Sequence, residues 1–88
     1  MKAWIIYCNG QGYINDFRRV NAKSIAALAE EWLCEQREKP DPEDVKVEKH
    51  LGWPWRYAVS VEGCYAAGFE KQSQAEHFAR LISKQPEE

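Results

Sequence analysis

Large apolar side chains alternate with small or polar ones over residues 55–69, on both sides of a Glu62-Gly63 step. A period of two is typical of β-strands, and a glycine between two such runs is typical of a hairpin turn. With a three-residue loop that begins at Val61, the predicted cross-strand pairs are Val59 with Tyr65, Tyr57 with Ala67 and Trp55 with Phe69. We therefore expect every bulky side chain of this hairpin on one face.

A second hairpin is predicted at the start of the chain. Residues 3–8 are rich in Trp, Ile and Tyr and predict a strand, and residues 13–20 predict the second strand of the hairpin. Asn9-Gly10 is a strong turn signal because both residues tolerate positive φ. Gly12 leaves the length of the loop open. The two registers are Ile6 with Tyr13 for a two-residue loop, and Trp4 with Phe17 for a four-residue loop.

An amphipathic helix is expected after Ser24, which is a suitable N-cap. Its apolar residues recur at the spacing of one buried helical stripe, which comprises Ile25, Leu28, Ala29, Trp32 and Leu33. Pro40 and Pro42 are expected to end this helix. Residues 41–44 then predict one further helical turn, and Val45 and Val47 alternate with charges as in a short edge strand.

A second helix is expected near the end of the chain, where Ser73 and Glu76 have the spacing of a capping box. Its predicted buried stripe comprises Ala75, Phe78, Ala79 and Ile82, and Lys84 is expected in its last turn. Residues 85–88 are expected to fray.

Both halves of the chain thus follow the order hairpin, serine cap, amphipathic helix. Residues 1–88 therefore predict a single α+β domain of ββα-ββα-like order, with a small, mainly antiparallel sheet. Both helices are expected on one face of this sheet, where they cover the aromatic side of the hairpin.

The composition bounds the function. A chain of 88 residues with 44% hydrophobic and 30% charged residues suits one modest core and leaves no room for a separate catalytic domain. No apolar segment approaches the length of a membrane span, and the apolar run after Met1 meets Asn9-Gly10 too early for a signal peptide. Cys8, Cys34 and Cys64 are odd in number and widely spaced, so we expect reduced, mostly buried thiols in a cytoplasmic protein.

Residues that carry catalysis or bind metal are sparse. His50 and His77 are isolated from each other and are expected to be solvated side chains, and no pair of Cys or His has the short spacing of a zinc site. The glycines match no phosphate-binding motif. We therefore expect no enzymatic activity, no metal and no cofactor.

The stretch Gly52-Trp53-Pro54-Trp55 is hard to explain as core, because two indoles beside a proline are not easily both buried in so small a domain. One interpretation is an exposed Trp that anchors a protein interface. The other is that Trp53 folds back over the edge of the core.

The first functional hypothesis is a non-enzymatic module that binds another protein through Trp53 and Trp55, through an acidic outer face of the first helix, or through both. The acidic face comprises Glu30, Glu31, Glu35 and Glu38, and it suits a basic surface, including one that normally holds nucleic acid. The alternative is a single-stranded nucleic-acid binder that uses Arg56, Tyr57 and Tyr65, provided that the helices leave these aromatics uncovered. Homodimerisation through an edge strand or the Trp loop is compatible with both hypotheses.

The strand that leads through Ala22-Lys23-Ser24 into an Ala- and Glu-rich helix resembles small phage-encoded inhibitors of host machinery, anti-CRISPR proteins among them. This resemblance implies an inhibitor or regulator of a host protein complex.

Overall fold

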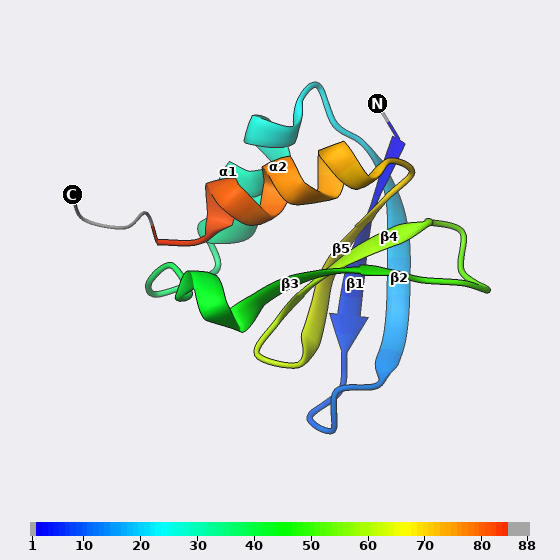
Figure 1. Ribbon diagram of the computed structural model, residues 1–88, viewed down its shortest axis with the longest axis horizontal. Helices are drawn as coiled ribbons and strands as arrows, with labels where there is room; N and C mark the ends of the chain where they lie inside the picture. The colour runs from blue at the N-terminus through cyan, green and yellow to red at the C-terminus, as the bar shows by residue number, and fades with distance from the viewer. Residues whose placement is uncertain (1, 85–88) are drawn as a thin grey trace.

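A five-stranded antiparallel sheet carries two helices on one of its faces (Figure 1) in the computed structural model, which describes residues 2–84. The strand order is β2-β1-β5-β4-β3. The elements are β1 Lys2–Cys8, β2 Ile14–Asn21, α1 Ile25–Leu33, η1 Pro42–Asp44, β3 Val45–Lys49, β4 Tyr57–Val61, β5 Cys64–Phe69 and α2 Gln72–Ile82. The predicted α+β class is confirmed, and β3 adds a strand to the second ββα unit. The expected frayed tail, 85–88, lies outside the described residues.

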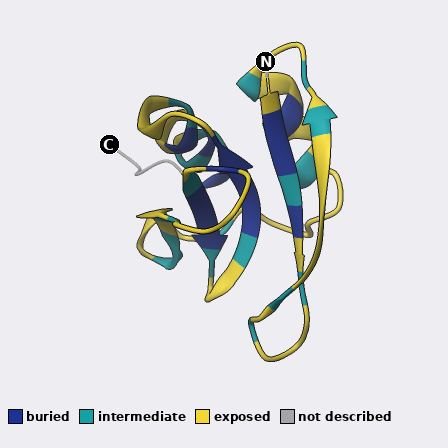
Figure 2. Cartoon of the chain, turned by 90° about the vertical axis from the view of Figure 1, so that its right-hand side faces the viewer, coloured by how far each residue is buried: buried dark blue, intermediate teal, exposed yellow. Residues whose placement is uncertain are grey.

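The main core lies between the sheet and the helices, where buried positions are dark blue in Figure 2. Phe78 of α2 packs on Phe69 of β5 with ring centroids 5.3 Å apart, and Trp32 of α1 meets Phe78 at 6.5 Å. The predicted stripes of both helices are confirmed, because their buried residues are Leu28, Ala29, Ala75, Phe78 and Ile82. The edge strand β2 is exposed over most of its length.

Helix α1 is shorter than expected. Ser24 caps it as predicted, with its Oγ accepting from Ala27 N at 3.1 Å, but the helix ends at Leu33 and not at Pro40. The amide of Glu35 donates to Trp32 O, three residues back, so the chain leaves the α-helical ladder here. Beyond Leu33 the next residues are polar and exposed, so a further turn would bury no apolar surface.

Helix α2 begins two residues earlier than predicted. Its N-cap is Lys71, whose amide donates to Gln74 Oε1 at 3.2 Å, so the expected capping box of Ser73 and Glu76 is wrong. Lys84 follows the helix instead of lying in its last turn, and its amide donates to Pro40 O at 2.8 Å. This bond joins the end of α2 to the segment that follows α1.

The hairpin of β4 and β5 has a two-residue turn with positive φ at both positions, 52° at Glu62 and 85° at Gly63. Ser60 pairs with Tyr65, but the next pair is Val59 with Ala67, so β5 contains one additional residue between these pairs. This bulge reverses the alternation of faces along β5. The predicted register is therefore wrong. The observed pairs also include Tyr57 with Phe69, Ala58 with Gly68 and Val61 with Cys64.

The first hairpin follows neither of the two registers that the sequence left open, because it pairs Ile6 with Phe17 and Trp4 with Arg19. Asn9 closes the loop through its side chain, whose Oδ1 accepts from the amides of Gln11 at 2.9 Å and Tyr13 at 3.1 Å. A side chain that caps its own loop stabilises a longer connection than a two-residue turn.

Candidate functional site

A second cluster of buried side chains lies on the sheet face that the helices leave open. It consists of Trp4, Ile6, Trp55 and Ala58, with Cys8, Ile14 and Tyr65 packed against it. The prediction that all bulky residues of the hairpin share one face is therefore wrong. Tyr57, Val59 and Phe69 belong to the core beneath the helices, whereas Trp55 and Tyr65 belong to the cluster on the open face.

Trp55 is the centre of this second cluster. It precedes β4 and is fully buried, with its ring on the open face above Gly68. A Cβ at Gly68 would lie 2.6 Å from Cδ2 of Trp55, so only glycine leaves room for the indole here. Trp4 meets Trp55 with ring centroids 6.3 Å apart. Trp55 therefore supports the rings of Trp53 and His50, and it is not itself accessible to a partner.

His50 joins these aromatic rings by a hydrogen bond and by stacking. Its Nδ1 accepts from Trp55 Nε1 at 3.0 Å, and its ring stacks on Tyr65 at 4.7 Å and on Trp53 at 5.8 Å. The expectation of a solvated His50 is wrong, because this ring is half-buried, whereas His77 is exposed as expected. Burial lowers the pKa of His50, and the nearby charge of Glu48 opposes this shift.

Tyr65 is fixed at its hydroxyl end as well as at its ring. The hydroxyl donates to Glu48 Oε2 at 3.1 Å. Burial raises the pKa of Tyr65, and the hydrogen bond to Glu48 raises it further, so the phenol stays protonated and remains a donor.

Trp53 lies flat on Trp55, with centroids 5.3 Å apart and an interplanar angle of 7°, yet 38% of its surface is exposed. Phe17 of β2 meets Trp53 edge-on at 5.9 Å and is also 38% exposed, and the adjoining Leu51 is 81% exposed. We call this group the aromatic surface: Phe17, His50, Leu51, Trp53 and Tyr65. The interpretation that Trp53 folds back over the core holds only in part, because its ring stacks on the buried Trp55 and still leaves 38% of its surface exposed.

The loop that carries Trp53 is held at both ends by the backbone. The amide of His50 donates to Arg56 O at 2.8 Å, the amide of Arg56 donates to Phe69 O at 3.0 Å, and Gly52 supplies a positive φ of 84°. The loop therefore presents Trp53 from a closed turn and not from an extended strand.

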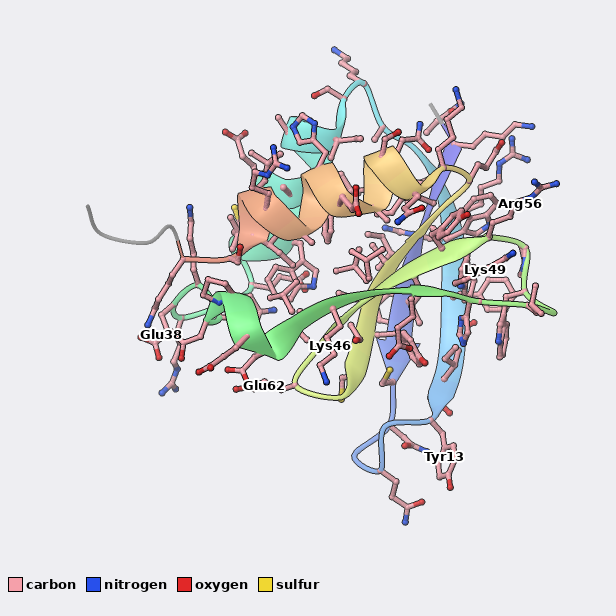
Figure 3. The ribbon with its side chains drawn as sticks, viewed as in Figure 1. Tyr13, Glu38, Lys46, Lys49, Arg56 and Glu62 are labelled. Atoms are coloured by element: carbon pink, nitrogen blue, oxygen red, sulfur yellow. The ribbon has the colours of Figure 1, made fainter. Side chains whose placement is uncertain are left out.

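Cations border the aromatic surface. Arg19 pairs with Trp4 and so shares the open face of β2 with Phe17, two residues away, while Arg56 adjoins Trp55 in the chain. Figure 3 shows Arg56 and Lys49 at one end of the molecule, with Glu38 and Glu62 at the other. Arg56 thus lies far from Glu38 and Glu62, and the carboxylate at the aromatic surface is that of Glu48, which accepts from Tyr65.

The four glutamates predicted as one acidic helix face do not all lie on a helix. Glu30 and Glu31 belong to α1, but Glu35 lies in the turn after it and Glu38 lies farther along the chain, 3.9 Å from Lys84 Nζ. All four are exposed. They lie on the helix side of the sheet, so one flat partner surface does not contact both them and Trp53.

The residues predicted to bind nucleic acid are also divided. Tyr57 is half-buried in the core beneath the helices, Tyr65 lies on the open face, and Arg56 is exposed. The sequence missed Phe17 and His50 as members of the site. Neither carries a local signal, because β2 and the loop before β4 meet only in the folded sheet.

The cysteine side chains are more exposed than the sequence predicted. Cys34 and Cys64 are exposed and Cys8 is half-buried, so the prediction of mostly buried thiols is wrong. Within residues 2–84, His, Cys, Asp and Glu form no group of three suited to a metal ion. Over the same residues, no helix has the length and apolar character that crossing a membrane requires.

Comparison of this chain with protein-family models, with curated proteins and with solved structures gave no match.

Proposed function

We propose that this protein is a non-enzymatic module that binds another protein through its aromatic surface. The observation that carries the proposal is Trp53, which is stacked flat on a fully buried Trp55 and remains 38% exposed. Tryptophans that are large, rigid and partly exposed are enriched among the residues that dominate binding energy at protein interfaces.

Preorganisation supports this proposal. The Trp53 ring is already held by Trp55, by His50 and by the edge of Phe17, so ordering it on binding loses little side-chain entropy. The expected partner has an apolar side chain that packs over the exposed parts of Phe17 and Trp53, and acidic side chains that complement Arg19 and Arg56. The acidic residues Glu30, Glu31, Glu35 and Glu38 take no part in this contact.

The proposed biological role is that of a small inhibitor or regulator of a host protein complex in the cytoplasm. This role agrees with the resemblance to phage-encoded inhibitors of the strand that leads through Ala22-Lys23-Ser24 into the Ala- and Glu-rich helix. A partner whose binding face is covered by the aromatic surface would lose access to its usual ligand.

Single-stranded nucleic acid is the second candidate ligand, and one observation favours it. The helices cover the face that contains Tyr57 and leave Phe17, Trp53 and Tyr65 on the open face, close in the sheet to Arg19. Bases can stack on such rings while arginines neutralise phosphates. The net charge of -2 opposes this ligand, so we rank it second.

The test is affinity capture from host-cell lysate with and without nuclease, followed by reconstitution with the purified partner. Trp53→Ala should weaken the reconstituted complex by at least about 30-fold, or about 2 kcal/mol. His77→Ala, an exposed change on α2, is the matched control and should bind as the wild type does. A complex that forms only with labelled single-stranded oligonucleotides and disappears with added salt would replace the proposal by the second candidate.

A further inference from the structure

Cys8 takes the place of a backbone partner between two strands. The pairing of β1 with β5 runs from Ala3 and Phe69 to Ile5 and Ala67. Farther along, next to the bulge in β5, the amide of Tyr65 donates to Cys8 Sγ at 3.0 Å and the Cys8 thiol donates to Tyr65 O at 3.5 Å. One sulfur atom thus satisfies both backbone groups of Tyr65.

This position brings Cys8 next to Cys64. The nitrogen of Tyr65 is about 2.4 Å from Cα of Cys64 across their shared peptide bond. Cys8 Sγ, at 3.0 Å from that nitrogen, therefore lies within about 5.4 Å of Cys64 Cα. Burial raises the pKa of the Cys8 thiol, the hydrogen bond with the Tyr65 backbone opposes this shift, and the neighbouring Cys64 thiol adds to it. A disulfide spans Cα atoms about 4.4–6.8 Å apart, so a Cys8 sulfur this close to the Cys64 backbone is within reach of one.

We propose that Cys8 and Cys64 are a redox modification site, at which a low-molecular-weight disulfide such as glutathione disulfide converts the two thiols into a bond between β1 and β5. Cys64 is exposed, so its thiolate attacks the oxidant first. That step forms a mixed disulfide at Cys64 and releases one small thiol.

The second step closes the bond within the protein. The Cys8 thiolate attacks the sulfur of Cys64 and displaces the second small thiol. The two protein thiols together lose two protons and two electrons, and the oxidant gains them as two small thiols. Cys8 is shielded by its half-buried position, which suits the resolving role because it needs to meet only Cys64.

The disulfide would fix the chain beneath the aromatic surface, because Tyr65 follows Cys64 and stacks on His50. The redox site is a property of the thiols alone, so it does not rest on the proposed function.

The purified full chain is titrated with glutathione disulfide and analysed by intact mass and by peptide mapping without reductant. The wild type and Cys34→Ser should lose the mass of two hydrogen atoms and yield one peptide pair that joins Cys8 to Cys64. Cys8→Ser and Cys64→Ser should not. Because the bond closes a long loop, the melting temperature should rise by at least about 4 °C and return on reduction.

Three results would overturn the proposal: a glutathione adduct that persists on Cys64 of the wild type, a bond that involves Cys34, or oxidation that leaves the melting temperature unchanged or lower. Cys64→Ser changes an exposed side chain, so it keeps the test valid if Cys8→Ser fails to fold.

Discussion

Trp55 occupies the space that any side chain at position 68 would take. A Cβ at Gly68 would lie 2.6 Å from Cδ2 and 2.8 Å from Cβ of Trp55, so Gly68→Ala must displace the indole. We expect a loss of about 2 kcal/mol in the free energy of unfolding, as is common for overpacked cores. Urea denaturation followed by tryptophan fluorescence measures it.

The matched control is Gly10→Ala, because a Cβ at Gly10 meets nothing within 4 Å. It should change the free energy of unfolding by less than about 0.5 kcal/mol. Equal stability of Gly68→Ala and the wild type would show that the Trp55 ring does not pack directly against Gly68.

His50 should make stability depend on pH. Burial lowers its pKa in the folded protein, and protonation at Nδ1 removes the acceptor of the Trp55 hydrogen bond. The unfolded chain, with a histidine pKa of about 6.5, then binds the proton more readily. The contribution of His50 is therefore present above about pH 6.5 and is lost as the pH falls through the lower pKa of the folded protein.

Melting temperatures of the wild type and His50→Gln, compared at pH 7.5 and pH 5, check this dependence. The advantage of the wild type should shrink at the lower pH. His77→Gln, which changes the exposed histidine of α2, should keep a constant difference from the wild type. A His50→Gln difference that is the same at both pH values contradicts the assignment.

At the scale of elements, the N-cap predicted from the sequence forms in α1 but not in α2. Ser24 accepts from Ala27 N at 3.1 Å, whereas the cap of α2 is made by Gln74 on the amide of Lys71. Ser24→Ala should reduce the free energy of unfolding by about 1 kcal/mol, and Ser73→Ala should change it by less than about 0.5 kcal/mol. Thermal denaturation of both variants decides, and a larger loss for Ser73→Ala would favour the cap expected from the sequence.

Element type was predictable from the sequence, but register and boundaries were not. Period and apolar spacing are local, so they indicated both helices, the strands and the edge position of β3. The additional residue in β5 has no local signal, yet it moves Tyr65 to the open face. The end of α1 at Leu33 follows from how much apolar surface the core accepts and not from the next proline.

At the scale of the whole molecule, the candidate site could be predicted only in part. Trp53 stood out because a Trp beside a proline is difficult to bury in a small domain, and it is indeed partly exposed. Phe17 and His50 could not be found, because their contacts with Trp53 join segments that the strand order brings together. The same order hides Tyr57 and buries Trp55, although the local pattern treats all these aromatic residues alike.

The distribution of charge over the molecule should decide how fast a protein partner associates with it. Arg19 and Arg56 border the aromatic surface, whereas Glu30 and Glu31 belong to α1, which lies on the other face of the sheet (Figure 1). Replacing both arginines by glutamate should slow association with the captured protein partner by about 10-fold at low salt, because charges at the rim of an interface steer encounter. Replacing both glutamates by lysine should leave the rate within about 2-fold, since these exposed charges lie on the helix side of the sheet and are screened by salt. Stopped-flow association at two salt concentrations measures both rates, and the effect of the arginine changes should diminish as salt increases. If the glutamate pair slows association more than the arginine pair, the partner binds the helix side and the aromatic surface is not the interface.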